Sequence, residues 1–548
     1  MRDDRSLNDR EKMEEMNVTA ETRDTCEKFD DSVEGCKKGE MESLQLEENK
    51  LREIISNEFQ GHMKDMRQEI SELLDNRMIN MVSDILQRME KVTTNDSKEI
   101  IDAAKYCNRS KPAKQDTLPM KQFLQRNSLL TDLYEIKHIR AMYNLIVATL
   151  IFLFIHAAIY DIRTTGSPDF AIGTIRRGFG KFPMVLYVWT LMTLSTCGVY
   201  VAFCYWATRR EQWSPTSFKR KLWDYTWLTS FIIYQILFMV FPTKSVLKED
   251  LPIASSMIVL MEQTRMVMKS HAFVRTLAPR FLAFKPHSDM SPVKPPGFSK
   301  FLYFFFAPTL IYRDSYPRAQ KIRWNVVLVN FTEVLAIIIF VAILYQRLLQ
   351  PTFEDFGTKP VEWGMLALNI ISSITPGIIM FICGFYLLLH SWMNAFAELL
   401  RFADKMFYKD WWNSICYSTY YRTWNIVVHD WLYTFIYKDM YEIVTRRNKL
   451  LSTITVFMIS AIVHEYILSF TFRFFYPVLM CLFGGIGIFI LLVLRSSGNI
   501  FLWFSLLLGN GVIASLYCME YFARLNCPPY RDDFLDYLIP RTWTYILQ

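Results

Sequence analysis

The chain has 548 residues, of which 51% are hydrophobic and 15% aromatic, and its formal net charge is +7. Apolar runs of span length in such a composition argue against an ordinary soluble protein and predict an all-α, polytopic membrane protein. The ten cysteines show no metal-ligand spacing, so no metal site is expected. We expect no cofactor either. No sequence signature of nucleic-acid binding is present.

The first 48 residues are acidic and lack apolar periodicity. Residues 1–50 contain 9 Lys and Arg against 16 Asp and Glu, without the apolar core that a signal peptide needs. We therefore expect residues 1–48 to be a disordered cytosolic head, and membrane insertion to use internal spans.

Residues 49–95 are predicted to form an amphipathic helix. Apolar side chains recur at spacings of three and four from Leu51 to Val92, which gives a heptad-like seam. Such a seam needs a partner, either further copies of the chain in a homo-oligomer (a dimer or tetramer) or the protein's own surface. Residues 96–139 follow as a linker and pre-membrane segment, and residues 140–548 form the membrane domain.

Nine transmembrane helices are predicted from apolar runs of about 20 residues, the length that crosses a hydrocarbon core. Buried or re-entrant helical pieces are expected near 300–311 and 422–437. Basic residues after the second span place that loop and the N-terminus in the cytosol and the C-terminus in the lumen, although basic residues before this span argue the other way. The predicted spans are 141–160, 183–206, 223–241, 251–268, 325–345, 363–389, 452–472, 474–494 and 500–522.

His464 lies about 12 residues into the seventh predicted span, roughly 18 Å from its start at about 1.5 Å per residue. An ionisable group at that depth is costly and usually faces a cavity or a polar partner. A neutral imidazole there can act as a general base toward a hydroxyl. It can equally be a structural group that bonds a neighbouring helix, and the local sequence leaves both interpretations open.

A second polar set overlaps the piece near 422–437. If this segment is one helix, Tyr421, Asn425 and His429 follow at four-residue spacing and form a polar stripe on an apolar surface. Asn425 could stabilise a developing oxyanion or hold a reacting hydroxyl, or it could be a polar contact between helices. His429 is more readily interpreted as structural.

The segment 407–413 combines four aromatic rings with charged and amide groups. Alone, this cluster is typical of an aromatic anchor at a membrane interface. With nearby basic residues such as Arg422 and Lys449, it can instead form a wall for a ligand that is part apolar and part phosphate, such as cytosolic acyl-CoA. The segment consists of Phe407, Tyr408, Lys409, Asp410, Trp411, Trp412 and Asn413.

Segment 407–413 together with His464 resembles the signature of the membrane-bound O-acyltransferases (MBOAT). Three further blocks, at 268–275, 306–318 and 428–433, resemble the sterol O-acyltransferase subgroup in particular. The resemblance runs from about residue 120 to residue 545. These blocks are long and specific, so a chance match is implausible.

The resemblance implies an MBOAT fold with a catalytic cavity in the endoplasmic-reticulum membrane, in a homo-oligomer. The implied reaction moves a long-chain acyl group from acyl-CoA to a sterol hydroxyl, with cholesterol as the expected acceptor. Diacylglycerol is the alternative acceptor, and a non-catalytic lipid transporter or lipid-binding protein is the alternative class, although no internal repeat is found. The resemblance makes His464 the catalytic base and Asn425 its helper. It places around the acyl-CoA tunnel Tyr421, Arg422, His429, Tyr433, Tyr437, Lys449 and Ser460.

Two positions depart from the subgroup's pattern. Ala272 stands where relatives commonly have serine, which argues against a hydroxyl nucleophile there and fits direct transfer without an acyl-enzyme. Some relatives join two cysteines beyond the last span in a disulfide, whereas here Cys527 stands alone in that region. This disulfide therefore cannot form, although Cys518 could take part in a different pairing. We expect the cytosol-facing chemistry to be intact.

Overall fold

The structure is a computed structural model that describes residues 121–283, 294–358, 362–445, 447–494, 498–529 and 535–544. These residues lie in the second of two compact units of the chain, residues 118–548. The predicted head over 1–48, the helix over 49–95 and most of the linker lie outside the described residues. Within the described ranges the protein is built from helices, and no β-strand is assigned.

Seven helical segments in the described part are long and apolar enough to cross a membrane. Each coincides with a predicted span, which confirms an all-α membrane protein. The seven are α4 (Lys137–Thr165), α5 (Ile172–Gly178) continued by α6 (Phe182–Glu211), α7 (Phe218–Lys248), α10 (Trp324–Leu344) continued by η1 (Tyr345–Leu349) and α11 (Gln350–Phe353), α12 (Trp363–Phe385) continued by η2 (Tyr386–Trp392) and α13 (Met393–Leu399), α16 (Lys449–Phe472) and α18 (Asn499–Asn526).

The two other predicted spans differ from these seven, so the count of nine is not confirmed. The span at 251–268 lies in α8 (Ile253–Ala283), which packs against α6, α7 and α16. Its charged groups find partners inside the protein: Arg265 donates to Glu262 at 2.6 and 2.8 Å, and Lys269 is buried. The span at 474–494 is a shorter apolar segment, η6 (Met480–Gly487) followed by α17 (Ile488–Val493).

Short helices complete the described chain and carry most of the predicted site. In chain order they are α3 (Leu129–Leu133), α9 (Phe298–Phe306), η3 (Trp411–Asn413), α14 (Tyr417–Trp424), α15 (Ile426–Leu432), η4 (Tyr433–Tyr437), η5 (Met440–Val444), α19 (Leu535–Leu538) and α20 (Arg541–Thr544). The piece expected near 300–311 is thus the nine-residue α9 followed by irregular chain.

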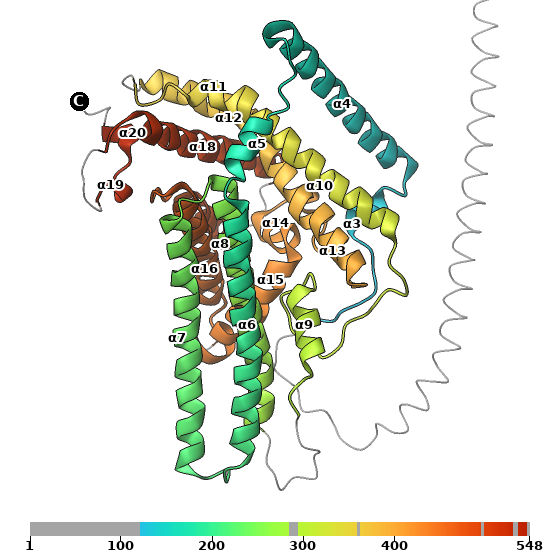
Figure 1. The fold of residues 1–548 in the computed structure, drawn as a ribbon, viewed down its shortest axis with the longest axis vertical. Coiled ribbons are helices and arrows are strands. Elements are labelled where there is room, and N and C mark those ends of the chain that lie inside the picture. Colours follow the sequence, from blue (N-terminus) through green and yellow to red (C-terminus); the bar gives the residue numbers. More distant parts are fainter. Residues whose placement is uncertain are drawn as a thin grey trace, which may run out of the picture. The chain divides into compact units, whose positions relative to one another are not determined.

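Helices α12 and α18 lie side by side along much of their length (Figure 1). Glycine allows this close approach, because a Cβ on Gly511 would lie 2.6 Å from Ile374 Cγ1 and 2.9 Å from the carbonyl oxygen of Ile370. A Cβ on Gly377 would lie 3.1 Å from the carbonyl oxygen of Asn510. Both helices contact α14, because the Phe381 ring on α12 stacks on that of Trp424 at 4.5 Å and the Ser505 hydroxyl on α18 lies 2.6 Å from that of Tyr417.

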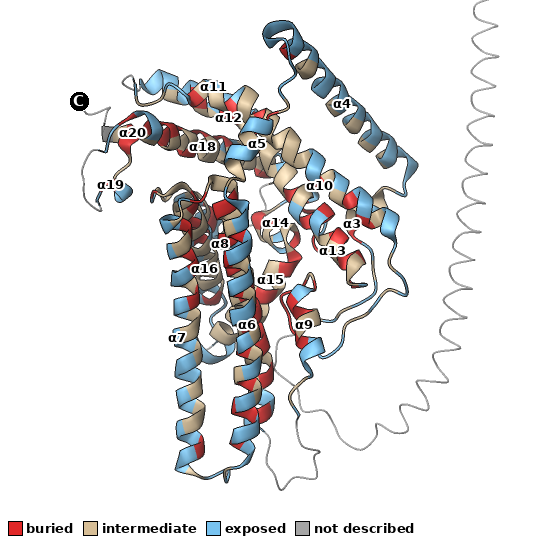
Figure 2. Cartoon of the chain, viewed as in Figure 1, coloured by how far each residue is buried: buried red, intermediate tan, exposed pale blue. Residues whose placement is uncertain are grey.

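Burial separates the lipid-facing helices from the core (Figure 2). Among the residues of α4, Asp161 alone is buried, and the apolar side chains of this helix are largely exposed, as expected for a lipid-facing span. The largest hydrophobic core is rich in aromatic rings. It combines side chains from α8, α9, α14, α15 and the 402–411 segment.

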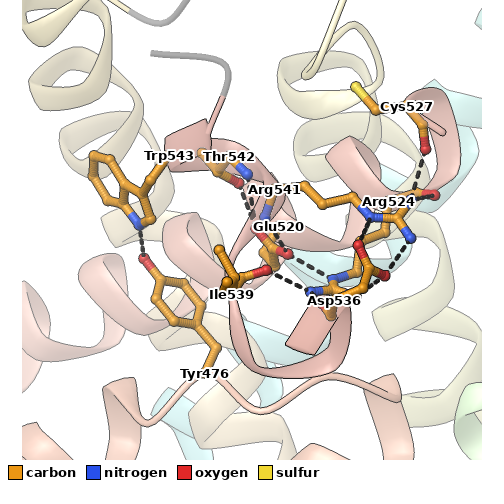
Figure 3. A network of polar contacts seen from close by, with 9 residues as sticks. All are labelled: Tyr476, Glu520, Arg524, Cys527, Asp536, Ile539, Arg541, Thr542 and Trp543. Carbon is orange, nitrogen blue, oxygen red and sulfur yellow. Dashed lines mark hydrogen bonds and ion pairs between the residues drawn. The ribbon is translucent and has the colours of Figure 1, made fainter. Parts of the chain in front are cut away.

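The chain after α18 is held by polar contacts around a buried carboxylate (Figure 3). Glu520 accepts hydrogen bonds from Arg524 Nε at 2.6 Å, from the backbone N–H groups of Arg541 and Thr542 at 3.0 Å each, and from Thr542 Oγ1 at 2.8 Å. Cys518 and Cys527 are both free thiols. Cys527 Sγ instead donates to the carbonyl oxygen of Gly357 at 3.0 Å, so the pairing left open for Cys518 is not formed.

Candidate functional site

The polar segment around Asn425 is two helices rather than one. Helix α14 ends at Trp424, and Asn425 has an extended backbone with φ −139° and ψ 91°. Its Oδ1 accepts a hydrogen bond from the Val428 N–H at 3.1 Å and so caps α15. The predicted continuous stripe through Tyr421, Asn425 and His429 is therefore wrong, because an extended residue resets the helical register between the two helices.

His464 lies on α16 with its imidazole exposed in the described chain. Its Nδ1 is 2.7 Å from the carbonyl oxygen of Ser460, one turn earlier, and 3.5 Å from the Ser460 hydroxyl. A carbonyl oxygen can only accept, so Nδ1 carries the hydrogen in the neutral ring. Nε2 consequently keeps its lone pair, which is the tautomer that a general base requires.

A cluster of aromatic rings joins His464 to Tyr421. The ring of Phe483, on η6, lies 5.8 Å from that of His464 and 5.2 Å from that of Tyr421, measured between centroids. Phe457, on α16, contacts both Tyr421 at 4.8 Å and Phe483 at 5.5 Å. Gly487 provides space for this contact, because a Cβ there would lie 3.2 Å from the Tyr421 hydroxyl. The structure thus brings two predicted site residues into one cluster.

Four rings form a ladder along α15, η4 and η5. The centroids of His429, Tyr433, Tyr437 and Tyr441 are 6.2, 5.6 and 6.0 Å apart in turn, and the planes differ by 15°, 13° and 5°. All four side chains are partly exposed. Because η4 packs against α16, the ladder runs beside the helix that carries His464. Tyr441 was not predicted, although the four-residue repeat of rings in the sequence extends to it.

His429 stands next to an ionised carboxylate. Asp430 Oδ1 is 3.5 Å from His429 Nδ1, and Asp430 Oδ2 forms an ion pair with Lys121. Burial alone would raise the pKa of the Asp430 carboxyl, but the hydrogen bond from His429 and the charge of Lys121 hold this pKa below its usual value. A carboxylate that is held by Lys121 therefore lies on one side of the His429 imidazole.

The block at 268–275 forms the surface on which α15 and η4 dock. Trp431 Nε1 donates to the carbonyl oxygen of Met268 at 2.9 Å, and the His271 ring lies 5.5 Å from the rings of both Trp431 and Phe435. Ala272, in the same block, has no exposed surface and lies in the aromatic core. A nucleophile is therefore absent at this position, and the position does not face open space.

Charged groups in the same block hold the neighbouring segments. Lys269 Nζ donates to the carbonyl oxygens of Phe304, Phe305 and Ala307 at 2.7, 2.8 and 2.7 Å, at the end of α9. These carbonyls lack helical partners at a helix C-terminus, where a cation is favourable. Arg275 donates to both oxygens of Asp439, between η4 and η5, at 3.0 and 3.1 Å. The block thus connects α9 to the ring ladder.

Segment 407–413 places three of its four rings inside the protein. The side chains of Phe407, Tyr408 and Trp411 are at most 3% exposed and belong to the core, so these rings do not form an anchor in the lipid. The binding of acyl-CoA by this segment stays a prediction. Lys409, Asp410 and Asn413 are exposed, and Trp412 is partly exposed. The local composition could not reveal this burial, because the helices that cover the rings come from distant parts of the chain.

The backbone of segment 407–413 holds the break at Asn425. The N–H of Lys409 donates to the carbonyl oxygen of Thr423 at 2.8 Å, and the N–H of Ile426 donates to that of Phe407 at 2.9 Å. These two bonds satisfy polar groups on either side of Asn425, where the helical hydrogen bonds are interrupted. The segment therefore stabilises the break between α14 and α15.

The remaining predicted residues lie at the edges of the site. Arg422 on α14 and Lys449 at the first turn of α16 are both exposed cations. Phe457 and Phe483 are site residues that the sequence reasoning missed. Phe457 precedes His464 by two helical turns and was recognisable from that spacing. Phe483 had no sequence signal, because tertiary packing alone brings η6 against α16.

Comparison with known proteins gives consistent results over the membrane domain. The model of the MBOAT, membrane-bound O-acyltransferase family matches residues 180–519. Sterol O-acyltransferase 1 of Cricetulus griseus is 42% identical over 453 residues, which cover 81% of this chain and 82% of the relative. Sterol O-acyltransferase 2 of Mus musculus is 38% identical over 433 residues, which cover 77% of this chain and 80% of the relative.

Proposed function

Because the chain belongs to the membrane-bound O-acyltransferase family, we propose that it transfers a long-chain acyl group from acyl-CoA to the hydroxyl of cholesterol. The chain is an O-acyltransferase with many membrane helices. The observation that carries the choice of acceptor is the similarity to sterol O-acyltransferases over about four fifths of both chains. The products are a cholesteryl ester and free CoA.

The chemistry at His464 is direct transfer within a complex of both substrates. Nε2 takes the proton of the sterol hydroxyl as its oxygen attacks the thioester carbonyl, the carbon–sulfur bond breaks, and the imidazolium returns the proton to the departing CoA thiolate. The hydrogen bond from Nδ1 to the Ser460 carbonyl supports this step, because it selects the neutral tautomer whose lone pair is on Nε2 and strengthens when the ring becomes charged. No acyl-enzyme is needed.

Two features support acyl-CoA as the donor. The ring ladder from His429 to Tyr441 offers an apolar, partly exposed face beside α16, and Arg422 and Lys449 supply cations for phosphate groups. The sterol enters from the bilayer. The resemblance to sterol O-acyltransferases leads us to place the enzyme in the endoplasmic-reticulum membrane as a homo-oligomer. We orient it with a cytosolic N-terminus and a luminal C-terminus, because basic residues cluster after the second span.

The test is a reaction of the purified protein with labelled oleoyl-CoA and either cholesterol or diacylglycerol. The expected products are labelled cholesteryl oleate and an equal amount of free CoA. Triacylglycerol formation at a higher rate than cholesteryl ester formation would overturn the choice of acceptor. Binding of oleoyl-CoA without release of CoA from either mixture would overturn catalysis itself and favour a lipid transporter or lipid-binding protein.

Asn425 has two separable roles, and two substitutions distinguish them. Asn425→Asp keeps an oxygen that caps α15 but removes the amide donor, whereas Asn425→Ala removes both. If the amide donates to the developing oxyanion, both variants should lose about 100-fold in kcat, while Asn425→Ala should additionally lose about 1 kcal/mol of stability. Wild-type kcat in Asn425→Asp would restrict Asn425 to helix capping. Steady-state kinetics and thermal unfolding of the two variants measure both effects.

A further inference from the structure

The pre-membrane segment 121–128 lies on the site-bearing segments of the same chain. The Arg126 N–H donates to the carbonyl oxygen of Ala403 at 2.9 Å, and the Lys405 N–H donates to that of Arg126 at 3.0 Å. Arg126 Nε also binds Asp404 Oδ1 at 2.6 Å. At the other end, the carbonyl oxygen of Lys121 accepts a hydrogen bond from Arg313 Nη2 at 3.0 Å. The backbone of this segment is therefore fixed at both ends.

This fixed backbone places the Lys121 ammonium next to α15. Lys121 Nζ pairs with Asp430 Oδ2, and the two side chains are 16% and 19% exposed. The ammonium also lies 5.4 Å from the centroid of the Phe123 ring. Charges that are largely removed from water depend on their partner, because separating them leaves an uncompensated buried charge. Asp430 therefore has a defined position when Lys121 is present.

We propose that Lys121 and Asp430 are positioning residues for acyl-CoA binding. Lys121 fixes one oxygen of Asp430, and the other oxygen lies 3.5 Å from Nδ1 of His429, the first ring of the ladder. In this proposal the carboxylate attracts Nδ1 and so aligns the imidazole. His429 Nε2 is left to face the ligand. The inference rests on the proposed function, since it takes acyl-CoA as the ligand of the ladder. It makes the pre-membrane segment part of the donor site.

The test measures the KM for oleoyl-CoA in Lys121→Met, Asp430→Asn and the double variant. Each single change should raise this KM about fivefold or more, with a smaller effect on kcat. In these variants His429 is no longer aligned with the ladder, which weakens acyl-CoA binding and leaves the chemical step at His464 in place. The double variant should resemble the single ones, since both remove the same pair. Lys121→Met keeps most of the aliphatic stem, so a raised KM in this variant identifies the charge as the cause. Lys121→Arg keeps the charge and should retain most of the affinity.

The matched control is Arg280→Met. Arg280 and Asp314 form an ion pair at 2.6 Å whose side chains are 39% and 47% exposed, and neither residue contacts Asp430. The control should leave the KM for oleoyl-CoA unchanged. Asp430→Asn is nearly isosteric with the wild type. If Lys121→Met does not give the wild-type profile in size-exclusion chromatography, the KM of Asp430→Asn decides the test.

Two results would overturn the inference in an active enzyme. One is a wild-type KM for oleoyl-CoA in both Lys121→Met and Asp430→Asn. The other is full additivity of the two single effects in the double variant, which would mean that the residues act independently. Failure of the proposed function is distinguishable, because it would appear as absence of ester formation by the unmodified protein.

Discussion

His464→Ala is expected to abolish detectable cholesteryl ester formation while the protein still inserts and assembles. The substitution removes the nitrogen whose lone pair is left free by the Nδ1 bond to Ser460, and no other group then takes the sterol proton in the proposed step. General-base catalysis contributes about 10²–10⁴-fold, so residual turnover should fall to the background of the assay. Release of free CoA and formation of labelled ester by the purified variant measure the loss.

His156→Ala is the matched control for this prediction. His156 is an exposed histidine on α4, another helix of membrane length, and receives the same change in the same kind of environment. The control should keep wild-type turnover and the wild-type elution profile. Near-normal turnover in His464→Ala would remove His464 from the mechanism, and equal losses in both variants would attribute the effect to membrane assembly.

The membrane helices were the most predictable part of the fold, because length and apolar composition determine them locally. Seven predicted spans coincide with helices of that kind. The exceptions have physical reasons. Helix α8 carries Glu262, Arg265 and Lys269, whose charges are tolerable because partners inside the protein satisfy them. The segment 474–494 contains an eight-residue π-helix, which periodicity does not reveal.

The candidate site was predictable by residue type more than by geometry. His464 was recognisable because an ionisable group deep in an apolar span is energetically costly and usually has a function or a polar partner. The break at Asn425 was not predicted, because asparagine can either continue a polar stripe or cap a new helix. In the structure it caps α15. The Lys121–Asp430 pair joins residues 309 positions apart, so no local pattern contains it.

The tail after α18 carries the largest expected effect on stability. Glu520 is fully buried and accepts four hydrogen bonds, from Arg524, Arg541 and Thr542, and Asp536 binds both arginines (Figure 3). Glu520→Ala removes the central acceptor and leaves the buried N–H groups of Arg541 and Thr542 and the Thr542 hydroxyl without their acceptor, while Asp536 still pairs with both arginines. The loss of several buried hydrogen bonds at once should cost about 3–5 kcal/mol. We expect a markedly lower Tm in thermal unfolding followed by size-exclusion chromatography, with turnover of the surviving folded fraction unchanged.

Two further variants show whether this ionic cluster replaces the disulfide found in some relatives. Glu520→Gln keeps the volume and one acceptor oxygen, so its Tm should lie between those of the wild type and Glu520→Ala. Cys527→Ala removes a thiol that makes one hydrogen bond to Gly357, so it should change the Tm little, and reductant should leave the wild-type Tm unchanged. A wild-type Tm in Glu520→Ala, or a large fall on reduction, would show that the tail is held by something other than the carboxylate.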